Sequence, residues 1–162
     1  MHLEVRSISL ALLVLSACAS TPPAPATTES PATTGPSTVS GGPSLYQRLG
    51  GRDVIDAFVA TFVVNIGRDQ RIQLRFLFTD LDGLRGHLSA QICEASGGPC
   101  KYTGKPMKSG HTGMHVRDAE FDAMAEDLVA ALKAHGIGTS EQKELLGVIG
   151  SLRPDIVEGP PP

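Results

Sequence analysis

Apolar residues recur every three or four positions along much of this chain, the spacing that places them on one face of an α-helix. Four stretches follow it: residues 54–66, 81–95, 121–132 and 145–157. No stretch shows the strict alternation that is typical of a half-buried strand. The pattern therefore predicts an all-α fold.

The ends of these stretches carry the residues that begin and end helices. Asp118 opens the third stretch and Gly136 closes it, while Gly-Gly-Pro at residues 97–99 closes the second. Thr139 and Gln142 have the spacing of a capping box at the start of the fourth. Residues 100–116 lack clear periodicity, and a connection of that length is usually either functional or disordered.

The N-terminal residues 1–18 have the pattern of a secretory leader. A short apolar run at residues 8–15 follows Arg6, and it is too short to span a bilayer as a helix. Leu15-Ser16-Ala17-Cys18 resembles the bacterial lipobox, in which the cysteine becomes lipidated. We expect Cys18 to anchor the protein to a membrane; the alternative is an ordinary cleaved signal with a buried cysteine.

Residues 19–43 form the next segment, with six Pro, ten Ser or Thr, four Ala and three Gly among 25 positions. Such a composition cannot bury enough apolar area to offset the entropy of ordering the chain, so we expect a disordered tether. The folding unit is then residues 44–158, followed by a flexible tail at 159–162. The predicted location is the membrane surface facing the periplasm or the cell exterior.

Composition and charge exclude some classes of function. A formal net charge of −3 gives no basic footprint for nucleic acid. Only 4% of residues are aromatic, few for a core of this size. We find no phosphate-binding loop, dinucleotide-binding fingerprint or serine nucleophile elbow.

Histidine chemistry is the remaining option. His111 and His115 have a spacing that could bind zinc on a helix, but Gly113 lies between them and no acidic ligand is near. His87 falls beside the apolar face of the second stretch, where a lone histidine is more often a hydrogen-bonded core residue than a ligand. If His111 faces the same interior, the two imidazoles meet the need of an iron porphyrin. A Cys-x-x-Cys-His haem attachment motif is absent.

Several motifs together resemble one family, the group I truncated haemoglobins, which are short two-over-two helical globins. The resemblance covers nearly all of residues 45–157. The motifs are LYQRLGG at 45–51, DQRI at 69–72, GGPCKYTGKPMK at 97–108, HTGM at 111–114, FDAMAEDLVAAL at 121–132 and PDIV at 154–157. This resemblance implies a truncated globin fold built around haem.

The resemblance also implies roles for individual residues. His111 matches the proximal histidine that binds the haem iron, and Phe76 matches a phenylalanine that packs against the porphyrin. Phe62 and Met107 fall where pocket-lining residues lie. Arg85, Lys105 and Lys108 are either partners of the haem propionates or solvated surface residues.

Departures from the family pattern concern the distal side of the haem. Val63 stands where many members have a tyrosine that donates to bound oxygen, and Leu84 and Leu88 stand where glutamines are common. His87 matches a histidine that becomes a sixth iron ligand in cyanobacterial members. Leu152 falls near the histidine that can link covalently to haem, so non-covalent haem b is expected.

These implications lead to a haem-binding globin that binds a diatomic gas such as oxygen or nitric oxide. The alternatives are a bis-histidine electron-transfer or redox-sensing protein, which needs an electron donor that the sequence does not identify, and a nitric oxide dioxygenase or peroxidase-like enzyme. A binding role is favoured over an enzyme because the distal tyrosine is missing. A lipoprotein that kept the fold without haem is a further alternative.

Cys93 and Cys100 are the cysteines left after the leader. They form an even pair in a compartment that allows disulfides, so we predict a bond between them that closes the loop toward His111. Two free thiols are the alternative.

Overall fold

The computed structural model describes residues 42–159. The predicted leader with Cys18, nearly all of the tether and residues 160–162 of the tail lie outside this range. Seven α-helices and one 3-10 helix follow one another in it: α1 (Leu45–Arg48), α2 (Gly51–Ile66), η1 (Gln73–Phe76), α3 (Leu81–Ala95), α4 (Met107–His111), α5 (Asp118–Ala134), α6 (Thr139–Gly150) and α7 (Arg153–Ile156). The all-α class is confirmed.

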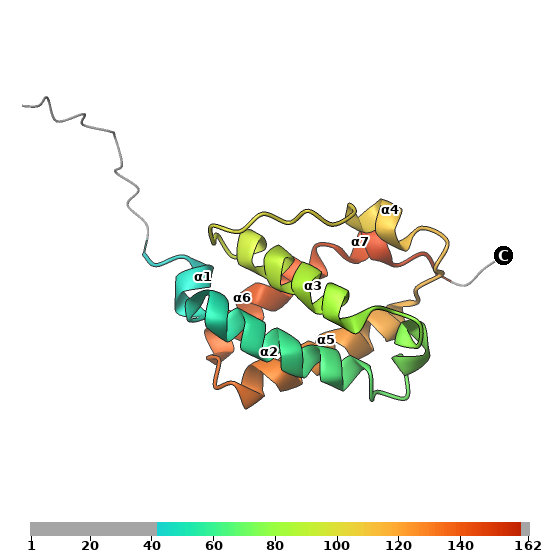
Figure 1. Ribbon diagram of the computed structural model, residues 1–162, viewed down its shortest axis with the longest axis horizontal. Coiled ribbons are helices and arrows are strands. Elements are labelled where there is room, and N and C mark those ends of the chain that lie inside the picture. The colour runs from blue at the N-terminus through green and yellow to red at the C-terminus, as the bar shows by residue number, and fades with distance from the viewer. Residues whose placement is uncertain (1–41, 160–162) are drawn as a thin grey trace, which may run out of the picture. The chain divides into compact units, whose positions relative to one another are not determined.

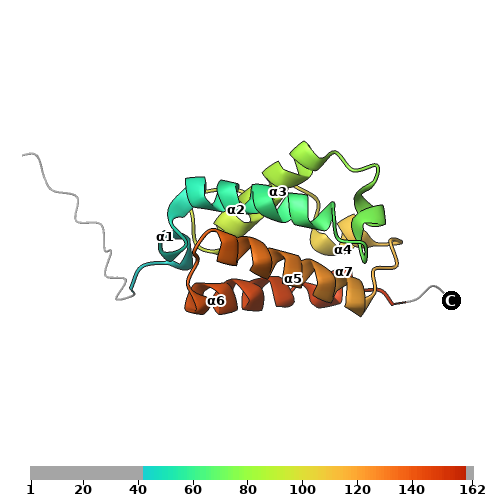
Figure 2. The ribbon, with the colours of Figure 1, turned by 90° about the horizontal axis from the view of Figure 1, so that it is seen from below.

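The four long helices form two layers. Helix α2 packs against both α3 and α5, and α5 in turn contacts α6. Figure 2 shows α2 and α3 in one layer and α5 and α6 in the other. The short helices α4 and α7 contact each other and lie together at one end of the layers (Figure 1).

The apolar stripes form the core between the layers. On α2, residues one turn apart such as Ile55, Phe58, Val59 and Phe62 are buried, and they meet buried residues of α3, α5 and α6. Burial of such stripes is the main stabilisation of helices of this length, because isolated helices are marginal in water.

The fourth predicted helix is divided in two. Helix α6 ends at Gly150, and α7 begins at Arg153 with Pro154 in its first turn. Proline has no backbone N–H to donate and its ring clashes with the preceding turn, so a continuous helix through residues 150–157 is broken here. The predicted stretch at 145–157 is therefore corrected to the end of α6 followed by α7.

The predicted capping box of Thr139 and Gln142 does not form. Gly138 is the N-cap of α6, and no side chain caps it. The Gln142 side chain instead donates to the carbonyl of Ile137 at 2.8 Å. Residues 100–116, expected as one connection, contain the one-turn helix α4. No helix among residues 42–159 is long and apolar enough to cross a membrane.

Candidate functional site

Two adjoining cavities open between α3, α5 and the short helices. The larger cavity has a volume of about 430 Å³ and the smaller about 150 Å³. Both are lined by Leu84, His111, Met124 and Ile156, so they are parts of one interior region. Apolar side chains supply most of the lining, and a largely apolar cavity with a few polar groups is the usual form of a cofactor site.

His111 is fixed in the wall that the two cavities share. It is the last residue of α4, and its ring Nδ1 lies 2.7 Å from the carbonyl oxygen of Met107, one turn earlier. A carbonyl oxygen only accepts, so Nδ1 carries the proton and the lone pair of the neutral ring is on Nε2. This orientation and tautomer are what a metal-binding imidazole requires.

His87 reaches the smaller cavity from α3. His87 is exposed to solvent, so it lies at the rim of the cavity and not in the core. The Tyr102 ring stands edge-on to the imidazole, with ring centroids 6.1 Å apart. The Tyr102 hydroxyl donates to the carbonyl of Lys105 at 3.0 Å, so this tyrosine is held by its own loop.

The structure brings most of the predicted site residues to these cavities. Phe62, Leu88 and Met107 line the smaller cavity together with His87 and His111, Phe76 lines the larger one, and Leu84 lines both.

Four predicted site residues are not among the lining side chains, and one of them, Lys105, is exposed in the loop before α4. Val63 is buried in the core. It does not line the cavity with its neighbour Phe62, because successive residues of a helix point about 100° apart. Arg85 forms an ion pair with Asp82 at 3.3 Å and lines a polar groove with Arg52 and Asp56. Lys108 is exposed on α4.

The smaller cavity is also lined by two polar residues that the sequence did not single out. One is Tyr102; the other is Gln91, whose amide donates to the Met107 sulfur at 3.4 Å. Gln91 lies one helical turn after His87, so helical spacing from that histidine is the signal that could have found it.

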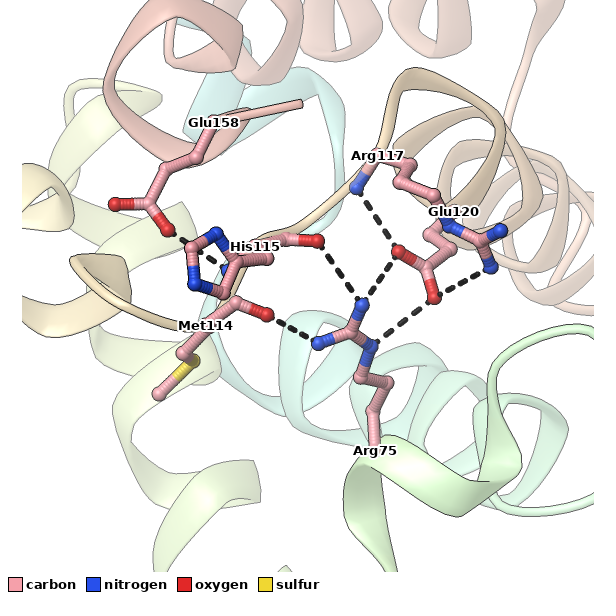
Figure 3. A network of polar contacts seen from close by, with 6 residues as sticks. All are labelled: Arg75, Met114, His115, Arg117, Glu120 and Glu158. Carbon is pink, nitrogen blue, oxygen red and sulfur yellow. Dashed lines mark hydrogen bonds and ion pairs between the residues drawn. The ribbon is translucent and has the colours of Figure 1, made fainter. Parts of the chain in front are cut away.

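Arg75 and Glu120 form a charged group in the wall of the larger cavity, also not anticipated (Figure 3). The guanidinium donates to both carboxylate oxygens of Glu120, at 3.0 and 2.8 Å, and Arg117 donates to the same carboxylate. Burial of Glu120 opposes ionisation, but hydrogen bonds from Arg117 and Arg75 outweigh it and lower the pKa of Glu120 to about 2. The carboxylate is therefore charged at neutral pH.

The Cys93 and Cys100 sulfurs are bonded, which ties the end of α3 to the loop that carries Tyr102. Cys93 is fully buried, and Arg52 lies 3.6 Å from the Cys100 sulfur. His115 lines neither cavity, and no group of three His, Cys, Asp or Glu side chains among residues 42–159 could hold a metal ion.

Comparisons with known proteins agree with this architecture. The family model of the bacterial-like globins matches residues 44–158. The group 1 truncated haemoglobin GlbN of Mycolicibacterium paratuberculosis is 34% identical over 72% of this chain and 85% of its own. GlbN of a Synechocystis species is 36% identical over 67% of this chain and 90% of its own.

Solved structures are similar to this chain in fold as well as in sequence. The truncated haemoglobin of Tetrahymena pyriformis in its Fe(III) form gives a TM-score of 0.69 at 32% identity, covering 71% of this chain and 98% of that one. The 2/2 haemoglobin of a Synechococcus species with covalently attached haem gives 0.67 at 28% identity, with 71% and 98% covered. The predicted two-over-two fold is confirmed, and the chain belongs to the bacterial-like globin family, among the group 1 truncated haemoglobins.

Proposed function

We propose that this protein binds a diatomic gas, such as oxygen or nitric oxide, at a haem b held non-covalently by His111. Membership of the globin family makes haem the cofactor. The observation that carries the proposal is the His111 ring, whose Nδ1 contact with the Met107 carbonyl leaves Nε2 free to bind a metal in the wall of an apolar interior.

The residues present fit a porphyrin. The two adjoining cavities provide a continuous apolar lining between α3 and α5, to which Phe76, Leu84 and Met124 contribute. Polar side chains are a minority of this lining, and two of them, Arg75 and His87, are exposed to solvent. A flat, mostly apolar macrocycle with an iron at its centre matches such a lining.

The side chains around His111 set the conditions of binding. Phe62, Leu84 and Leu88 present apolar surface to the smaller cavity and offer no hydrogen-bond donor to a bound gas, so the donors in its lining are polar groups such as His87, Gln91 and Tyr102. The haem iron, when bound, supplies the coordination position at which the gas binds. Valine at position 63 lacks the hydroxyl that many members offer to bound oxygen, so we expect faster oxygen dissociation than in a member with that tyrosine.

An absorption spectrum of the purified protein after haem addition tests the proposal. We expect a Soret band for the wild type and its shift on adding carbon monoxide to the ferrous form. His111→Ala should lose the band or bind haem at least tenfold more weakly. His115→Ala is the matched control, because that ring is four residues away and exposed, and it should retain the band. A wild type without a Soret band contradicts the proposal.

A second candidate is a bis-histidine haem protein, in which His87 is the sixth ligand and the role is electron transfer or redox sensing. It is favoured by one observation: His87 and His111 both line the smaller cavity. Low-spin spectra that become high-spin in His87→Ala, but not in the control His135→Ala, support it. Spectra unchanged by His87→Ala exclude it and leave the gas-binding role.

We also propose that a lipid on Cys18 anchors the protein to a membrane. The support is the sequence of residues 15–18 after an apolar run. Labelling of expressing bacteria with a palmitate analogue should mark the wild type and not Cys18→Ser. A wild type that is secreted without label contradicts the anchor.

A further inference from the structure

We propose that Arg75 and Glu158 are positioning residues for the iron-binding histidine, because they hold the segment at residues 113–116 from two sides. Glu120 completes the arrangement by holding Arg75. This inference rests on the proposed role of His111 as the haem ligand.

The segment that needs holding begins directly after His111. Helix α4 ends there, and the chain turns away through Gly113 at φ +81° and His115 at φ +50°. A left-handed conformation is uncommon for a residue other than glycine and costs free energy. A segment with two such residues and few regular backbone hydrogen bonds depends on contacts from elsewhere to keep its shape.

One set of contacts comes from Glu158, after α7. Its two carboxylate oxygens accept the backbone N–H groups of Gly113 at 2.9 Å and His115 at 2.8 Å. The backbone N–H of Glu158 donates to the carbonyl of Val116 at 3.0 Å. Hydrogen bonds to an ionised carboxylate are stronger than neutral ones, so this residue fixes the backbone of the segment at three positions.

The other set comes from Arg75, on the 3-10 helix η1 before α3. Its guanidinium donates to the carbonyls of Met114 and His115, the latter at 3.1 Å, and on its other edge to the carboxylate of Glu120 (Figure 3). Glu120 is only 8% exposed and lies in the first turn of α5. Arg75 therefore connects the segment after His111 to a fixed point on a core helix.

These contacts restrict the position of His111 by holding the backbone that follows it. The ring is held from the N-terminal side by the Met107 carbonyl, and the backbone on its C-terminal side is held by Arg75 and Glu158. Outer-shell groups that orient a metal-binding histidine typically change metal affinity tenfold or more when removed. We expect the same scale for retention of haem.

The test compares Arg75→Gln with Arg71→Gln. Arg71 is a matched control, because it lies four residues earlier and also pairs with an acid on α5, Glu126 at 2.6 Å, but makes no contact with the segment. We expect ferric Arg75→Gln to lose haem to excess apomyoglobin about tenfold faster than the wild type, and Arg71→Gln within twofold. Equal rates for the two variants overturn the inference.

Amide hydrogen exchange of the apoprotein supplies a readout that needs no haem. Arg75→Gln and Glu158→Gln should speed exchange at Gly113 and His115 by tenfold or more, with the core amides of α2 unchanged. A uniform increase over the whole domain means general destabilisation and overturns the inference. Failure of the wild type to take up haem contradicts the proposed function instead, and the exchange data still report whether the segment is held.

Arg75→Lys separates geometry from charge. A lysine ammonium is a point charge and cannot span a carboxylate and two carbonyls as the guanidinium fork does. We expect its haem loss to resemble that of Arg75→Gln; full recovery of the wild-type rate means that charge alone is sufficient and overturns the positioning role.

Discussion

Glu120 illustrates how single residues acquire properties that their sequence position does not reveal. A glutamate in the first turn of a helix is ordinarily a solvated residue that favours the helix dipole. Here it is buried and paired with Arg117 at the N-cap of its own helix and with Arg75, which is 45 positions earlier in the chain. Removal of its charge leaves two arginines without their acceptor, and broken hydrogen bonds to charged groups cost about 1.5–3 kcal/mol each.

The lowered pKa of Glu120 makes its contribution depend on pH. Its ordinary value of 4.5 falls to about 2 in the folded protein, so the stabilisation is complete above about pH 4.5 and is lost as pH falls toward 2. Glu120→Gln should lower the free energy of unfolding at pH 7 by about 1–3 kcal/mol and remove part of the acid dependence. Urea denaturation between pH 2 and 7 measures both. Glu126→Gln, whose side chain is 67% exposed, is the control and should change little.

The elements around the site are held by covalent and steric constraints as well as by apolar packing. The Cys93–Cys100 bond closes a loop between α3 and the segment with Tyr102. Gly98 lies inside that loop, where a Cβ atom would come within 2.7 Å of the Tyr46 ring and of Cys93. The connection between α3 and α4 therefore has little freedom to repack.

Loss of the disulfide should destabilise the domain. The chain-entropy model for a loop of this length gives about 2.5 kcal/mol. Urea midpoints with and without a reductant measure the loss, and the variant Cys93→Ser with Cys100→Ser should match the reduced protein. Alkylation of both cysteines in the unreduced protein would contradict the bond.

A larger side chain at position 98 should also be costly. Gly98→Ala forces the Tyr46 ring or the Cys93 backbone to move, and overpacking typically costs 1–3 kcal/mol. Gly147→Ala on α6 is the matched control, because its Cβ meets nothing within 4 Å and alanine favours a helix over glycine by about 1 kcal/mol. Thermal unfolding should show opposite shifts for the two variants.

The domain as a whole has an interior that its own side chains fill incompletely. The entire chain has only seven aromatic residues to fill its core. The two cavities extend between the helices and are lined in part by core residues such as Phe62 and Leu128. A bound porphyrin removes this defect in packing, so the folded state and the cofactor stabilise each other.

Haem should therefore raise the melting temperature of the domain. A ligand present at 1,000 times its Kd adds about 4 kcal/mol to the free energy of unfolding. Calorimetry of the apoprotein and of the protein with one equivalent of haem measures the difference, with zinc protoporphyrin as a control for filling the cavity with a different metal. An apoprotein as heat-stable as the haem complex would falsify the link between packing and cofactor.

The positions of the long helices followed from the chain itself, because a 3.6-residue period can be recognised without knowing what the helix packs against. The all-α class and the region of each apolar face, for example Phe58 and Phe62 on α2, needed no tertiary information. The break before Pro154 was readable in principle, since proline disrupts the interior of a helix and is tolerated only in its first turn. His111 was identified by its resemblance to a family motif, and not by periodicity.

Tertiary structure alone decided which side chains meet across the sequence. Arg75 and Glu120 are 45 positions apart, and Glu158 lies 43 positions after His115, so no local pattern links them. Val63 and Arg85 matched family positions near the pocket, yet the rotation of α2 and α3 leads them elsewhere. The sequence by itself determined the long helices, because their apolar period is local, and the candidate ligand His111, because a family motif marks it. The path of the chain after that ligand depends on hydrogen bonds and ion pairs that form only once the layers have assembled.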